Sequence, residues 1–214
     1  MSDIFQFWEN YRLPDWRHPQ DCAVLKRTER DFNSKCLPTP FTGPLRNAPV
    51  TLLYLNPSVS KSDFVEAKTA NGHLPRLSGL EPLPGPDEHR EGWEWWKSRT
   101  KRFGDWTDLR SKVAILQLCP YHSEKFDRRV LLLSLPSSRT TLEWAQDVLF
   151  PQAKNGDRIV ICLRAHKDWG LDTGKSYGQG LFSPLTTRGG HMHDGRMRGK
   201  IVSAVREILS LDRV

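Results

Sequence analysis

Three short, uninterrupted apolar segments limit what this chain can fold into more than any other feature of the sequence. They are PVTLLYL from Pro49, VAILQL from Val113 and RIVICL from Arg158. A strand that is buried on both faces of a sheet has a continuous apolar sequence, whereas a strand with one wet face alternates. Each segment ends at a turn and is followed by helical sequence, as crossovers between parallel strands require. The sequence therefore predicts an α/β fold, a three-layer sandwich around a central, mostly parallel sheet.

A single domain, residues 1–214, is expected, because a chain of this length forms one substantial core and no second core is visible. Residues 49–210 are predicted to form the α/β core. Residues 1–48 should cover it, with a short amphipathic helix that carries Ile4, Phe5 and Trp8, followed by irregular structure. Near the other end, an apolar stripe from Ile201 to Leu209 predicts a closing helix.

The composition favours a polyanionic partner. Lys and Arg number 32 against 25 Asp and Glu, which gives a formal net charge of +7. Such an excess attracts nucleic acid, although it also improves solubility. No apolar run approaches the roughly 20 residues of a membrane span, and the first residues lack the pattern of a secretory signal. A cytoplasmic protein without a membrane partner is therefore expected. The four cysteines are scattered, so no disulfide framework or zinc site is predicted.

The residues that end the apolar segments are the first candidates for a functional site. In an open α/β sheet, ligands bind beyond the carboxyl ends of the strands. These positions hold Asn56-Pro57-Ser58, the stretch from Gln117 to Ser123, and Arg164-Ala165-His166. A further candidate is FSPLTTRGGHMHDGR from Phe182, in which a Ser-Pro turn and two adjacent glycines predict a site loop rich in hydrogen-bonding groups.

The order of these motifs resembles the uracil-DNA glycosylase superfamily. LYLNPS from Leu53 is similar to the N-P-G motif of its mismatch-specific branch. VAILQL resembles the strand whose final Asn reads the base, with Gln117 in that place, and FSPLTTRGG resembles the H-P-S-P-L-S loop followed by Arg-Gly. The resemblance extends over residues 49 to 210. It implies a uracil-DNA-glycosylase-like fold and a hydrolase, without a cofactor, that cleaves the N-glycosidic bond of a damaged or deaminated base in DNA.

The resemblance also implies roles for individual residues. It places Asn56 and Ser183 in the catalytic motifs. It implies contacts to the base for Pro57, Ser58, Phe64, Gln117 and Phe182. Contacts to DNA are implied for Arg188, Gly189, Gly190, His191, His193 and Arg196.

The chemistry of these side chains leaves alternatives open. An Asn has no useful pKa, so Asn56 would position a hydrolytic water through its carbonyl oxygen and would not abstract a proton. Alternatively, Asn56-Pro57 only forms the turn after its strand. Gln117 carries an acceptor and donors that suit a pyrimidine edge or, equally, backbone groups at a strand end. Arg188 beside two glycines suits a phosphate contact or an ordinary solvated turn.

The sequence leaves two other functions open and argues against a metal site. His191 and His193 lie on one side of an extended segment, but no third ligand is evident and no metal site is predicted. Because Phe182 and Gln117 replace a His and an Asn of the family, the alternative function is a non-catalytic nucleic-acid or nucleotide binding module of the same fold. A third is a protein-interaction domain that uses the Trp-rich segment 93–106. An aromatic face packed on the core beneath Lys and Arg side chains explains that segment as well.

Overall fold

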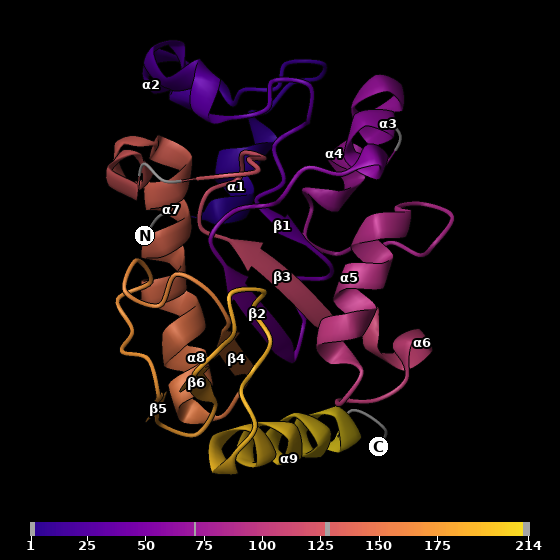
Figure 1. Ribbon diagram of the computed structural model, residues 1–214, viewed down its shortest axis with the longest axis vertical. Helices are drawn as coiled ribbons and strands as arrows, with labels where there is room; N and C mark the ends of the chain where they lie inside the picture. Colours follow the sequence, from indigo (N-terminus) through magenta and orange to yellow (C-terminus); the bar gives the residue numbers. More distant parts are fainter. Residues whose placement is uncertain (1–2, 71, 127–128, 212–214) are drawn as a thin grey trace.

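The computed structural model describes residues 3–70, 72–126 and 129–211, and its centre is a six-stranded mixed sheet (Figure 1). The strand order is β1-β3-β2-β4-β6-β5. The inner strands β3 (Val113–Gln117), β2 (Val50–Tyr54), β4 (Ile159–Cys162) and β6 (Leu181–Ser183) are parallel. The short edge strands β1 (Phe41–Thr42) and β5 (Lys175–Tyr177) are antiparallel to their neighbours. The chain is thus an α/β protein with a mostly parallel sheet.

The three apolar segments are confirmed as neighbouring parallel strands. Leu52 of β2 lies in register with Ile115 of β3 and Ile161 of β4. Every residue of these three strands is buried, which explains why their sequences do not alternate. The direction of strand addition reverses at β2, because the chain adds β3 on one side and then β4 on the other. Such a switch point opens a crevice at the carboxyl ends of the strands.

Helices cover both faces of the sheet (Figure 1). Leu53 and Leu116 belong to the core beneath α1 (Ile4–Glu9), α7 (Pro136–Trp144) and α8 (Phe150–Asn155). Leu52 and Ile115 belong to a second core beneath α5 (Arg90–Thr100), α6 (Trp106–Leu109) and α9 (Arg196–Leu211). Successive residues of a strand therefore point to opposite helical layers, as the pleat requires.

A π-helical turn, Ala145–Leu149, joins α7 to α8 in one continuous helical segment. Pro151 follows this turn. Proline lacks an N–H group, and its ring clashes with the carbonyl group four residues earlier in an α-helix. The wider π turn removes that conflict, so the segment continues and keeps Leu149 and Phe150 in the core.

The remaining elements are short. Figure 1 shows α3 (Lys61–Thr69) and α4 (His73–Arg76) at the end of the molecule toward which β3 points, with α2 (Cys22–Thr28). The described part of the chain also contains three 3-10 turns: Pro19–Asp21, Glu29–Asp31 and Arg129–Ser134. A capping box starts α3, in which the Ser60 hydroxyl accepts from Asp63 N and the Asp63 carboxylate accepts from Ser60 N. This box sets the position of α3 directly after the loop that follows β2.

One predicted boundary is wrong. The stretch from Phe182 was expected to be a site loop, but Phe182 and Ser183 belong to β6, which pairs with β4 on one side and β5 on the other. Phe182 is fully buried in the core that α9 covers. The loop begins after Ser183 and is closed by a bridge between Thr186 and Met192. A three-residue strand is too short for its sequence pattern to reveal it.

The Trp-rich segment packs on the core. Trp96 is buried, and Trp93, Trp95 and Trp106 are half-buried against the same core cluster. Lys97 Nζ lies 4.9 Å from the Trp93 ring centroid, and Arg99 Cζ lies 4.6 Å from that of Trp95. The structure matches the interpretation in which Lys and Arg side chains cover an aromatic core face.

The four cysteines are free thiols, and burial raises the pKa of Cys36 and of Cys119 to about 12. In the part of the chain that the structure describes, the helices are too short or too polar to cross a membrane.

Candidate functional site

The carboxyl ends of β2, β3 and β4 open onto a cavity of about 750 Å³, called the main cavity below. Asn56, Gln117 and Arg164, which follow or end these three strands, all line it. Its other walls come from α3, α4 and α5. The structure thus brings together several residues named from the sequence, at the crevice that the strand order creates: Asn56, Pro57, Ser58, Gln117 and Gly189.

Asn56 is held in place at the end of β2 by hydrogen bonds to the backbone. Its side-chain Nδ2 donates to the carbonyl oxygens of Pro57, at 2.9 Å, and Ser123, at 3.5 Å. These bonds stabilise the turn after β2. They also orient the amide, which leaves the carbonyl oxygen Oδ1 as its acceptor for a water or a ligand. The side chain is half-buried at the cavity wall.

Gln117 carries an unused acceptor. The residue is only 8% exposed, and its backbone N–H donates to Pro40 O at 2.8 Å. Within the described residues, no group donates a hydrogen bond to its side-chain Oε1. A buried polar atom without a partner costs about 1–3 kcal/mol. The arrangement therefore favours the interpretation in which Gln117 binds a ligand that carries an N–H group.

One wall of the main cavity is aromatic and cationic. The rings of Tyr54 and Trp95 meet edge to face, with centroids 4.7 Å apart. Arg99 Nη2 donates to Gly189 O at 2.8 Å, and Arg164 Nη1 donates to Arg188 O. The two guanidinium groups hold the loop after β6 against the cavity. Burial raises the pKa of the Tyr54 hydroxyl, and the charges of Arg99 and Arg164 only partly oppose this, so the phenol stays neutral.

Gly190 allows the loop to approach Tyr54. Its φ of +78° lies in the left-handed region, and a Cβ at this position would lie 2.9 Å from Tyr54 Cε1. Any other residue would be strained here and would push the loop away from the cavity wall.

The main cavity is also lined by a group of titratable side chains that sequence reasoning missed, named here the carboxylate–histidine cluster: Asp63, Glu66, His73, His89 and His122. Asp63 and Glu66 lie one turn apart on α3 and therefore share a face. His89 Nε2 donates to Asp63 Oδ1 at 2.9 Å, and both Ser60 N and Ser60 Oγ donate to Asp63 Oδ2 at 2.7 Å. Glu66 accepts from His73 Nδ1 and Arg76 Nη1, each at 2.7 Å.

These bonds keep both carboxylates ionised. Burial alone would raise the pKa of Asp63, but the hydrogen bond from His89 and the other donors outweigh it and lower that pKa. The same balance, with His73 and Arg76 as partners, lowers the pKa of Glu66. Burial lowers the pKa of His89, but Asp63 more than compensates and raises it. Both carboxylates are therefore ionised and paired with basic side chains, and their oxygens are already hydrogen-bonded.

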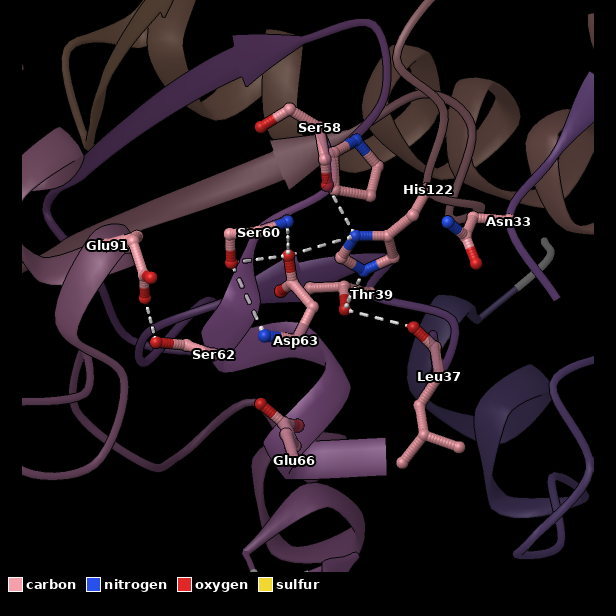
Figure 2. Close-up of polar contacts among 12 residues, drawn as sticks. Asn33, Leu37, Thr39, Ser58, Ser60, Ser62, Asp63, Glu66, Glu91 and His122 are labelled. Carbon is pink, nitrogen blue, oxygen red and sulfur yellow. Dashed lines mark hydrogen bonds and ion pairs between the residues drawn. The ribbon is translucent and has the colours of Figure 1, made fainter. Parts of the chain in front are cut away.

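His122 links Ser58, in the loop after β2, to Asp63 of α3 and to Thr39 (Figure 2). Its Nδ1 donates to Ser58 O at 2.5 Å and lies 3.6 Å from Asp63 Oδ2, and its Nε2 lies 3.0 Å from Thr39 Oγ1. Burial lowers the pKa of His122 despite the nearby carboxylate, so the ring is neutral at neutral pH. Next to it, Ser123 N donates to Pro57 O at 3.1 Å. The loop that carries Asn56 is thus fixed from β3 and α3.

The one local signal for this cluster is the spacing of Ser60 and Asp63, which is that of a capping box and which the sequence-based prediction did not use. The three histidines come from three separate segments, and nothing local links them to Asp63.

Three of the residues that the resemblance implies for catalysis or for contacts to the base do not line the main cavity. Phe182 lies in the core, with Lys200 Nζ 5.5 Å from its ring centroid. Ser183 is fully buried, and its Oγ bonds to His166 Nδ1 at 2.8 Å. Phe64 follows Asp63 on α3 and so points about 100° away around the helix. It lines a separate cavity of about 600 Å³ with Trp16 and Cys36.

The loop after β6 is divided between two cavities. Gly189 lines the main cavity, whereas Gly190 and His191 line a neighbouring cavity of about 160 Å³, called the small cavity below. Arg188, His193 and Arg196 are exposed, and Arg196 begins α9. Among the described residues, no group of three or more His, Cys, Asp or Glu side chains has an arrangement that could hold a metal ion.

No family model matches the chain, and no curated protein shows significant sequence similarity to it. The residues of the main cavity and of the small cavity are therefore the basis for inferring its function.

Proposed function

We propose that the protein is a uracil-DNA-glycosylase-like hydrolase that binds a nucleobase flipped out of DNA in the main cavity and cleaves its N-glycosidic bond. The observation that supports this proposal is the meeting of Asn56, Gln117 and Arg164, from three adjacent parallel strands, on one cavity of about 750 Å³. Cavities of about 300–1,000 Å³ bind small ligands, and a base with its sugar falls in that class. An acceptor for water, an acceptor for a base edge and a cation are the groups that this reaction needs.

Gln117 would recognise the edge of the base. Its buried Oε1 lacks a donor, so a base N–H would satisfy it, while a ligand without an N–H would leave it unpaired. The aromatic wall of Tyr54 and Trp95 offers apolar surface to the ring. A nucleobase therefore has an N–H group for the unused acceptor and an apolar ring for the aromatic wall.

Asn56 would position the hydrolytic water. The amide is held by two backbone carbonyls, so a water bound to Oδ1 has a fixed direction. Because an amide cannot take the proton, catalysis depends on positioning and on charge. Arg99 and Arg164 make the cavity wall beside β2 and β4 positive, which favours a base that leaves as an anion.

The proposal is tested with oligonucleotides that carry uracil, hypoxanthine, xanthine or alkylated bases, scored for abasic sites by strand cleavage under alkali. Excision of one of these bases by the wild-type chain, and its loss in Asn56→Ala, are expected. Absence of abasic sites across the panel, in a preparation shown to be folded, would contradict the glycosylase activity.

The non-catalytic binding module is a second candidate, and one observation favours it. Asp63 and Glu66 in the wall of the main cavity are both hydrogen-bonded to basic side chains, so neither carboxylate is free to act as a general base. The residue at the end of β2 is Asn56, whose amide cannot take up a proton. A protein of this kind would bind modified DNA as tightly as a glycosylase and leave it intact. Fluorescence anisotropy with the same oligonucleotides separates the two functions.

A further inference from the structure

We propose that the small cavity binds a phosphate group of the DNA strand whose base occupies the main cavity. The cavity lies between the end of α5, the carboxyl end of β4 and the loop that leads into α9. Its side chains include Arg99, Lys101, Arg102, His191 and Arg198. The part of the proposal that names a DNA strand rests on the proposed function.

The charge of the small cavity is of one sign. Within the part of the chain that the structure describes, no Asp or Glu side chain belongs to its lining. Arg198 forms an ion pair with Asp194, one turn earlier on the chain, so its charge is partly compensated. Lys101 and Arg102 are exposed at the edge and free to approach an anion. Phosphate is the anion for which several Arg and Lys donors around a small space are suited.

The positive charges act on the histidine in this cavity. His191 is exposed, and its pKa is lowered by partial burial and by the charges of Arg99 and Lys101. Both cations therefore lie close enough to disfavour protonation of the ring. An anion between these groups would relieve the repulsion and restore a higher pKa.

The position of the small cavity fits a strand that enters the main cavity. Arg99 lines both cavities, and the consecutive residues Gly189 and Gly190 line one each. The small cavity has about a fifth of the volume of the main cavity, which is enough space for a phosphate group. In a nucleotide, base and phosphate are joined through one sugar, so neighbouring cavities separated by a single loop are the expected arrangement.

The binding test uses inorganic phosphate in a phosphate-free buffer, with the ring protons of His191 followed by NMR across pH. The double variant Lys101→Gln/Arg102→Gln removes two cations of the small cavity. Lys175→Gln, on the edge strand β5, removes an exposed cation elsewhere and serves as the matched control. A saturable rise of the His191 pKa is expected in the wild type and in the control, and a weaker one in the double variant. A His191 pKa that does not respond to phosphate would overturn the proposal.

A second measurement identifies the source of the phosphate. The affinity for an abasic-site duplex, which has no base to recognise, is measured against salt concentration. Each lost phosphate contact reduces the slope of log K against log salt by about one. We expect a reduced slope for the double variant and an unchanged slope for Lys175→Gln. Equal slopes, or a polyglutamate peptide that shifts His191 where DNA does not, would overturn the DNA assignment.

The two proposals fail separately. Base excision with no response of His191 to phosphate and equal salt slopes would overturn the phosphate subsite and leave the glycosylase in place. A His191 response and a reduced slope without excision of any base would support the subsite and contradict the glycosylase.

Discussion

Asp63→Asn tests how the carboxylate–histidine cluster contributes to folding. The carboxylate accepts three hydrogen bonds, one from His89 on Oδ1 and two from Ser60 on Oδ2. An Asn has one oxygen, so the amide nitrogen must face a donor on one side or the other. The substitution therefore makes the acceptor of these hydrogen bonds neutral. It also places the amide nitrogen against a donor of His89 or of Ser60.

The magnitude follows from these contacts. Hydrogen bonds to a charged group contribute about 1.5–3 kcal/mol, against about 1 kcal/mol for neutral ones, so three bonds lose about 3 kcal/mol. Part of this is offset because a neutral amide is less costly to bury than a carboxylate. We expect the free energy of unfolding to fall by about 2 kcal/mol at pH 7.

The loss should depend on pH in a defined direction. Because the pKa of Asp63 is lowered on folding, its contribution is complete above the unfolded pKa of about 3.9 and is lost as pH falls through the folded value. The difference between wild type and Asp63→Asn should therefore shrink as pH falls from 5 to 3.

Urea denaturation followed by tryptophan fluorescence measures these differences. Glu94→Gln is the matched control, because it breaks the exposed Arg90–Glu94 pair on α5, and such pairs contribute at most about 0.5 kcal/mol. The reasoning is refuted if Asp63→Asn and Glu94→Gln have equal stability at pH 7, or if the loss does not change with pH.

Three further predictions concern residues at the main cavity. Asn56→Ala should abolish excision and lower stability by about 1 kcal/mol. Asn56→Asp should retain or raise the single-turnover rate of excision. Persistent excision by the Ala variant would contradict the catalytic role of Asn56. Gln117→Met should raise stability by about 1 kcal/mol and abolish base recognition, because it removes the unpaired Oε1. Thermal melting measures the change in stability and anisotropy measures base recognition. A fall in stability would show that Oε1 has a partner. Gly190→Ala should destabilise the protein by about 1–2 kcal/mol, because the residue has a positive φ and its Cβ would contact Tyr54. Gly199→Ala, in open space on α9, should be neutral or stabilising. Equal melting temperatures for these two variants would contradict this account.

Local sequence was sufficient for the central strands and for the residues that end them. The strands β2, β3 and β4 are continuous apolar runs because both of their faces are buried, and this signal does not depend on the rest of the chain. Asn56 and Gln117 could be named because the carboxyl ends of parallel strands meet at one edge of a sheet.

Short elements were beyond such reasoning. The strands β1, β5 and β6 have two or three residues each, which is fewer than the roughly four residues over which alternation can be recognised. Pairing with neighbouring strands holds them in place. Phe182 was therefore assigned to a loop, although it lies in β6 and packs beneath α9. Phe64 was assigned to the base, although its place on α3 turns it toward another cavity.

The tertiary structure alone decided the composition of the cavity walls. The three histidines that meet Asp63 and Glu66 belong to α4, to the residue before α5 and to the loop after β3, so packing of the whole chain brings them together. Arg99, which lines both cavities, is in the sequence one cation among many around the tryptophans. Hydrophobic period, and the burial it predicts, can be read from neighbouring residues in the sequence. A site built from several loops depends instead on distances between segments, which no local sequence pattern predicts.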